Sequence, residues 1–339
     1  MSQILFAPGD CVRVRSENFT SRWVKPHLRT PGYLFSQSGR VERICGLFEN
    51  PETAAYRSDG IKQPLYRVRF LQKDLWPEYE GSQKDTIDVE IYQHWLVLPE
   101  GPVPEPEANC SFNPLSEHSH DHLNEHEHDH VHEQRLEVEQ RAVDQEGAPG
   151  SVQNLAEILL SILLDKAILT KEELRLKIEE RELHGIQLRG ADVIARAWMD
   201  QDFKERLLEN ANKALLELGI EVEPQMIVVE NTEDIHNVIV CTLCSCYPRQ
   251  LLGMPPDWYK SRSYRARLPR EPRKVLQEFG TDISQDTLVR VHDSTADMRY
   301  MVLPQRPPST EDFTFPQLVS LVHRDSLIGV TRTLSSRQE

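Results

Sequence analysis

Alternation of apolar and polar residues marks the first hundred positions of the chain. The pattern is clearest over residues 10–15, 65–70 and 86–91, and glycine and proline residues separate these segments. Because successive side chains of a strand point to opposite faces of a sheet, this period of two is typical of short β-strands. We therefore expect residues 1–99 to form a small β-barrel.

From residue 151 the apolar period becomes helical. One helical face collects Leu155, Ile158, Leu159, Ile162 and Leu163. Thr170 followed three residues later by Glu173 is a capping-box pattern, which predicts the start of a second helix. Further helices are expected over residues 191–199 and 203–215, the last ended by Gly219. These apolar stripes favour core or subunit contacts over a cofactor site.

Strands are expected again over residues 288–292 and 299–303, followed by a short helix over 316–322. The C-terminal part is thus predicted to be helices that lead into a compact core of mixed helices and strands. Together with the N-terminal strands, this predicts an α+β fold.

Residues 100–150 separate these two parts and have a different composition. Prolines are followed by seven histidines that alternate with acidic residues between Glu117 and His132. So polar a stretch buries too little apolar area to offset its ordering entropy, which predicts a flexible linker. A passive linker and a tail that gathers divalent metal both remain open, whereas catalysis is not expected there. The predicted organisation is 1–99, 100–150 and 151–339.

Charge and composition exclude several classes of function. The formal net charge of −15 argues against binding of nucleic acid, because a phosphate backbone would be repelled. We find no run of 18 apolar residues and no signal-peptide pattern at the start, so a soluble cytoplasmic protein without a membrane partner is expected. The six cysteines are too few and too unevenly spaced for a disulfide framework.

Half of those cysteines lie together in the sequence, at Cys241, Cys244 and Cys246. Three sulfur donors this close can surround one metal ion, and we call residues 241–246 the claw. A disulfide would leave one thiol over, and no second ligand pair follows as in common zinc sites. Reactive or buried structural thiols are the remaining alternative to a metal site.

The surroundings of the claw resemble the α subunit of nitrile hydratase. The matching blocks are residues 190–198, 228–232, 236–237, 240–246, 253–261, 270–276 and 299–304. The N-terminal part resembles the C-terminal half of the β subunit of that family, at residues 6–10, 26–33, 39–41 and 66–70. The resemblance implies a β-type half fused through the histidine-rich linker to an α subunit. It also implies a separate chain that supplies the helical N-terminal half of the β subunit, in a hetero-oligomer.

The resemblance implies a role for each residue of the claw. Cys241 would be the axial thiolate, Cys244 a sulfinate and Cys246 a sulfenate, with the main-chain nitrogens of Ser245 and Cys246 completing the ligand set. Such a set leaves excess negative charge around a trivalent ion, which calls for nearby cations. Arg29 matches the family arginine that contacts the oxidised cysteines from the β side, although from the sequence alone it would be a surface residue.

Thr242 bears on the metal, because the resemblance associates threonine here with cobalt and serine with iron; cobalt(III) is expected ahead of iron(III). The implied activity is that of a lyase that hydrates a small nitrile to its amide, with a possible metal-insertion chaperone. Thiocyanate hydrolase is the close relative, and the cation at Arg249 favours an anionic substrate of that kind. A non-catalytic metal-binding assembly subunit is the third possibility. His236 is expected to pack or to form local hydrogen bonds.

Overall fold

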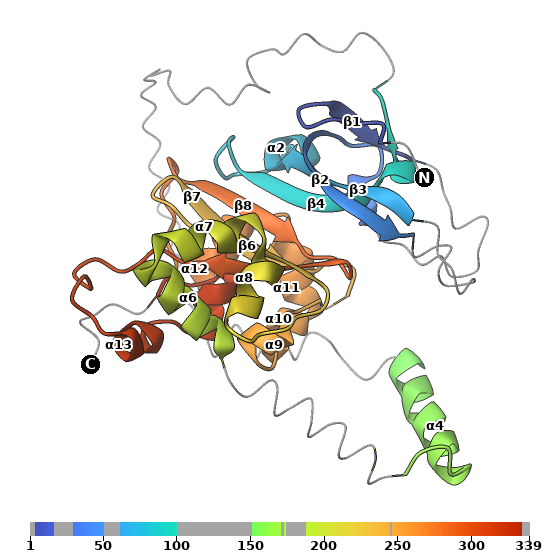
Figure 1. Cartoon of the computed structure of the whole chain (residues 1–339). Helices are drawn as coiled ribbons and strands as arrows, with labels where there is room; N and C mark the ends of the chain where they lie inside the picture. Colours follow the sequence, from blue (N-terminus) through green and yellow to red (C-terminus); the bar gives the residue numbers. More distant parts are fainter. Residues whose placement is uncertain are drawn as a thin grey trace.

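The computed structural model describes residues 4–16, 30–50, 62–99, 151–170, 173, 188–244 and 246–333. Figure 1 shows two adjacent parts, the strands β1 to β4 and a larger body of helices and strands that ends near the C-terminus. Arg29, Ser245 and the histidine-rich tract at residues 117–132 lie outside the described residues. The expectations placed on them are therefore taken up below as proposals.

The N-terminal part forms antiparallel strands at the three segments where alternation predicts them. In chain order the strands are β1 (Cys11–Val14), β2 (Ser38–Glu49), β3 (Lys62–Leu71), β4 (Thr86–Tyr92) and β5 (Leu96–Val97). Short helical turns lie between them, namely η2 (Gly32–Leu34), α2 (Gln72–Leu75) and η3 (Gln93–Trp95). Every residue of β4 is buried, so neither face of this strand is left to solvent.

Strand β4 continues the sheet into the C-terminal part. It pairs in parallel with β8 (Leu288–Asp293), which pairs in parallel with β7 (Ile235–Val240), and the sheet order is β5-β1-β2-β3-β4-β8-β7. The α+β fold is confirmed. A closed barrel is not, because among the described strands β4 pairs with β8 instead of closing onto β1 or β5. One cluster of buried apolar side chains runs from Val12 in the N-terminal part to Met301 in the C-terminal part.

The C-terminal part packs short helices around this shared sheet and around a second sheet, in which β6 (Gln225–Glu230) and β9 (Met298–Leu303) pair in parallel. The helices are α6 (Arg189–Met199), α7 (Gln201–Glu209), α8 (Ala211–Glu217), α9 (Arg249–Leu252), α10 (Asp257–Lys260), α11 (Arg262–Arg267), α12 (Pro272–Glu278), α13 (Phe315–Ser320) and α14 (Arg324–Ile328). The strands expected near 288 and 299 and the helix near 316 are confirmed.

The single helix expected over residues 203–215 is instead two. Asn210 lies between α7 and α8, and its side-chain oxygen accepts a hydrogen bond from the main-chain nitrogen of Lys213. An asparagine in this role offers the backbone an alternative to continued helix, and so begins a new one. The apolar period continued across the break, which is why periodicity alone missed it.

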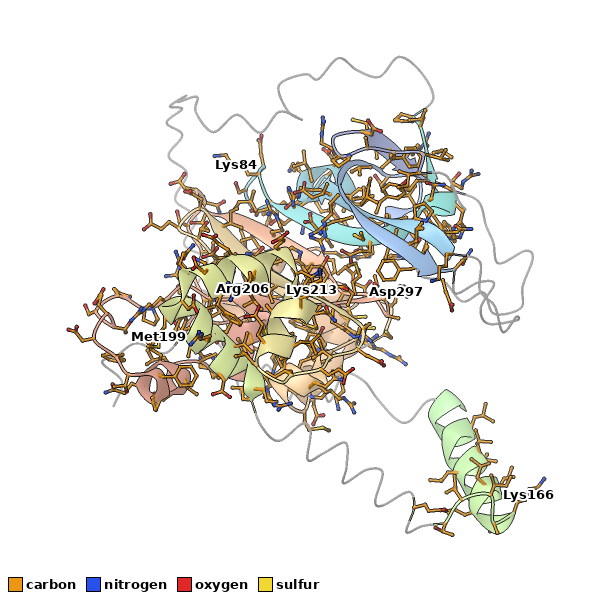
Figure 2. All side chains as sticks on the ribbon, in the orientation of Figure 1. Lys84, Lys166, Met199, Arg206, Lys213 and Asp297 are labelled. Atoms are coloured by element: carbon orange, nitrogen blue, oxygen red, sulfur yellow. The ribbon has the colours of Figure 1, made fainter. Side chains whose placement is uncertain are left out.

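Helix α4 (Ser151–Asp165) carries its apolar stripe into solvent. Leu155 is 60%, Ile158 55% and Leu159 54% exposed. Lys166, just beyond the helix, stands away from the body in Figure 2. The capping box at Thr170 is confirmed, because its hydroxyl accepts from the main-chain nitrogen of Glu173 at 3.1 Å. Among the described helices, none combines the length and apolarity needed to cross a bilayer.

Asp85, just before β4, connects the two parts. Its carboxylate accepts from Nε and Nη2 of Arg273 in α12 at 2.6 and 2.8 Å, and from the main-chain nitrogen of Val289 in β8 at 2.8 Å. The hydroxyl of Tyr79 donates to the same carboxylate at 2.6 Å. The Asp85 side chain is completely buried, so this ion pair is shielded from water.

Candidate metal centre

The three claw cysteines converge directly after β7 ends. The Sγ atoms of Cys241 and Cys244 lie 3.4 Å apart, and those of Cys244 and Cys246 lie 3.0 Å apart. All three sulfurs lie within 4.8 Å of one another, and they are the single group of this kind among the described residues. Both distances exceed the bond of about 2.05 Å in a disulfide, and the three cysteines are free. The disulfide alternative is therefore not supported.

Side chains outside the claw hold its backbone. The hydroxyl of Tyr259 donates to the carbonyl oxygen of Cys246 at 2.9 Å, and Nη1 of Arg265 donates to that of Cys244 at 2.8 Å. Just before the claw, the hydroxyl of Tyr264 donates to the carbonyl oxygen of Ile239 at 2.7 Å. These donors come from helices α10 and α11, so the path of the claw is set by a packed scaffold.

Asp293 fixes the claw from the opposite strand. Its carboxylate accepts from the main-chain nitrogen of Thr242 at 2.8 Å and from the Thr242 hydroxyl at 2.6 Å. The hydroxyl of Tyr33, which belongs to the N-terminal part, donates to the same carboxylate at 2.7 Å. The N-terminal part therefore contributes directly to the support of the claw.

Sequence reasoning missed Asp293, although a signal for it exists. Asp293 follows the expected strand 288–292, and in the parallel pairing of β7 with β8 it lies opposite Val240, the residue before Cys241. The carboxyl ends of parallel strands meet at one edge of a sheet. The strand pairing, which no local pattern reveals, was the missing step.

Burial raises the pKa of Asp293 to about 6, against the hydrogen bonds from Thr242 and Tyr33 that lower it. A carboxyl group with a raised folded pKa binds its proton more tightly in the folded state, so its contribution to stability falls as the pH rises from about 4 to about 6. Relative to an Asp293→Asn variant, the metal-free chain should therefore lose about 3 kcal/mol of unfolding free energy between pH 4 and pH 7.

Urea unfolding of both proteins across this range measures the difference, and any constant cost of the substitution cancels from its pH dependence. A Tyr33→Phe variant should move the fall to higher pH, since it removes one hydrogen bond that lowers the pKa of Asp293. A difference that stays flat with pH would contradict the assignment.

The thiols of the claw resist ionisation together. Hydrogen bonding with Cys244 and Cys246, followed by burial, raises the pKa of Cys241 far above its ordinary value. The hydrogen bond with Cys241 lowers the pKa of Cys246, but its contact with Cys244 and its burial outweigh this and raise the pKa to about 11. Three crowded thiolates thus need a compensating cation, and the donor set fits a metal ion that prefers sulfur.

The remaining candidates from the sequence lie in different settings. Nε2 of the buried His236 lies 2.7 Å from the carbonyl oxygen of Gly329, which confirms that this histidine packs and bonds locally. Arg249 begins α9 just after the claw and is exposed. Arg29 and Ser245 are outside the described residues, so their positions relative to the sulfurs stay predictions.

An open pocket of about 290 Å³ lies beside the claw at Thr242. Tyr33 and Trp76 of the N-terminal part line it, and their ring centroids lie 5.5 Å apart. Across from them the C-terminal part contributes three arginines, Arg262, Arg265 and Arg270. The pocket is therefore built by both parts of the chain.

Comparisons with known proteins agree with this two-part construction. Residues 151–331 match the family model for the nitrile hydratase alpha chain, and residues 2–98 match the model for the C-terminal part of the nitrile hydratase beta subunit. The chain is 50% identical over 175 residues to the alpha subunit of a low-molecular weight cobalt-containing nitrile hydratase of Rhodococcus rhodochrous, covering 50% of this chain and 84% of that protein.

Two further relatives differ in metal or in substrate. Thiocyanate hydrolase subunit gamma of Thiobacillus thioparus is 40% identical over 156 residues, covering 42% of this chain and 64% of that subunit. A solved structure of a double mutant of Fe-type nitrile hydratase from Comamonas testosteroni superposes with a TM-score of 0.51 at 39% identity, covering 56% of this chain and 94% of that one. The relatives thus include cobalt and iron types and two activities.

Proposed function

The chain belongs to the nitrile hydratase family, and from this premise we propose that it is a nitrile hydratase component that adds water to a small nitrile to give the amide. The observation that carries the proposal is the convergence of three cysteine sulfurs within 4.8 Å at the end of β7. In enzyme terms the activity is that of a hydro-lyase. Nitrile hydration and thiocyanate hydrolysis are the two activities of the relatives.

In this proposal Cys241, Cys244 and Cys246 hold cobalt(III), together with the main-chain nitrogens of Ser245 and Cys246. The cobalt-containing relative from Rhodococcus supports this metal, while the Fe-type neighbour keeps iron(III) as the alternative. Elemental analysis of the purified protein decides between them. The bound ion would supply Lewis acidity, which polarises the nitrile carbon.

The side chains of this family member then have separate tasks. Asp293, Tyr259 and Arg265 hold the claw backbone, so that the cysteines keep their positions during turnover. With Cys244 as sulfinate and Cys246 as sulfenate, the sulfenate oxygen or a water that it orients attacks the nitrile carbon. Net addition of one water across the carbon–nitrogen triple bond, followed by tautomerisation, gives the amide.

Arg29 is proposed to donate two hydrogen bonds from its guanidinium to the oxidised cysteines. Replacing Arg29 by Lys keeps the charge but removes the planar fork, so amide production per bound metal should fall on the order of tenfold. Metal content should change little. Steady-state rates and metal analysis on the same preparation test this, with Arg13→Lys in the exposed part of β1 as a matched control. Equal rates for the Arg29→Lys variant and the unaltered protein would remove Arg29 from the site.

A partner chain is also proposed. The N-terminal part matches only the C-terminal part of the beta subunit, so the rest of a beta-type subunit would come from a separate polypeptide in a hetero-oligomer. The exposed stripe of α4 at Leu155, Ile158 and Leu159 supports such a contact. Residues 100–150 would link the two parts as a passive or metal-gathering tract, and a metal-insertion chaperone would load the site.

Thiocyanate hydrolysis is the second candidate, favoured by the exposed cation at Arg249 and by the relative from Thiobacillus. The metal-loaded complex is offered propionitrile and thiocyanate side by side. Amide formation without carbonyl sulfide supports nitrile hydration, and the reverse supports the hydrolase. Mass spectrometry of the claw peptide addresses a non-catalytic scaffold, since unmodified thiols in metal-loaded protein would favour it over an oxidised catalytic centre.

A further inference from the structure

The pocket beside Thr242 concentrates positive charge in an acidic protein. Arg262, Arg265 and Arg270 line it, whereas the whole chain has a formal charge of −15. In the described part of the chain, none of the three forms an ion pair with a carboxylate. Arg265 donates from Nε to the carbonyl oxygen of Lys260 at 3.0 Å and from Nη1 to that of Cys244 at 2.8 Å, so it is fixed in place with its charge uncompensated.

Neighbouring arginines of the same helices show that carboxylates are at hand. Arg267 pairs with Glu271 at 2.5 Å and also with Glu278, and Arg273 pairs with Asp85 at 2.6 Å. The arginines that face away from the pocket are thus neutralised, and those that line it are not. An uncompensated cluster of this kind is costly unless an anion completes it.

The opposite wall of the pocket is aromatic. Tyr33 and Trp76 line it with tilted rings, and the indole is largely buried, so this side offers an apolar surface to a flat group. Guanidinium groups match the two oxygens of a carboxylate with paired hydrogen bonds. The volume of about 290 Å³ admits a small organic acid.

From this arrangement we propose that the pocket binds the carboxylate of a small, flat organic anion next to the claw. The proposal deepens the proposed function and rests on it in one respect: the preferred substrate would be a nitrile that itself carries a carboxylate. Binding of the anion is a property of the pocket alone.

The test uses benzoate and its neutral counterpart benzamide, titrated calorimetrically into the complex as isolated. Benzoate should bind at least about tenfold more tightly than benzamide. Arg262→Gln and Arg270→Gln, which alter exposed side chains, should each weaken benzoate by about tenfold and leave benzamide unchanged. Lys213→Gln, an exposed charge on α8 (Figure 2), is the matched control and should leave both affinities unchanged.

Three results would overturn the proposal. Equal affinity for benzoate and benzamide would show that charge is not read. Loss of benzoate binding on Arg249→Gln, with Arg262→Gln and Arg270→Gln unaffected, would move the anion site elsewhere. A fall in metal content with unchanged benzoate affinity would show that the arginines only compensate the claw. Benzoate binding that responds as expected in a protein without nitrile turnover would instead support the pocket and count against the proposed function.

Discussion

A Cys246→Ser variant is expected to fold normally and to lose turnover by on the order of a thousandfold or more. The substitution removes the sulfur that lies 3.0 Å from the Sγ of Cys244, and with it both a soft donor and the atom proposed to carry the reactive oxygen. The hydrogen bond from Tyr259 to the carbonyl oxygen of residue 246 does not depend on the side chain. The claw backbone should therefore keep its path.

Amide production, metal content and circular dichroism are measured on the same preparation. Cys11→Ser, in β1 of the N-terminal part, removes a thiol outside the claw and is the matched control. It should retain activity and metal. Undiminished amide production by Cys246→Ser would show that its sulfur is not required, and the proposed mechanism would then fail.

The spacing of the claw cysteines was sufficient to predict that their sulfurs converge, because few residues separate them and the chain has little freedom to part them. What holds the claw was not predictable in the same way. Asp293 and Tyr33 are 51 and 260 residues from their partners Thr242 and Asp293. Contacts at such separations depend on strand pairing and packing, which leave no local pattern in the sequence.

Local alternation located strands β3 and β4 but did not indicate what covers their polar side chains. Asp88 and Glu90 are buried, and they pair with Arg69 at 2.8 Å and Arg67 at 2.9 Å. In sequence such residues resemble a solvent-facing row, since the pattern of one strand does not contain its cross-strand partners. The pairing of β4 with β8 was hidden for the same reason, and the N-terminal part was expected to close on itself.

That pairing makes Asp85 the strongest test of the shared sheet. Asp85→Ala should lower the unfolding free energy by about 3–5 kcal/mol, because it leaves the guanidinium of Arg273 buried without its carboxylate. It also removes the acceptor for the main-chain nitrogen of Val289 in β8 and for the hydroxyl of Tyr79. The lost contacts join the N-terminal part to the C-terminal part, so both should be destabilised.

Urea unfolding followed by tryptophan fluorescence and by circular dichroism measures the loss. The matched control is Glu80→Ala, which breaks the ion pair with Lys274, where the side chains are 75% and 58% exposed. An exposed pair contributes at most about 1 kcal/mol, so this variant should unfold close to the unaltered chain. If Asp85→Ala proved no less stable than Glu80→Ala, the two parts would not be joined through this carboxylate, and the continuous sheet would lose its principal polar connection.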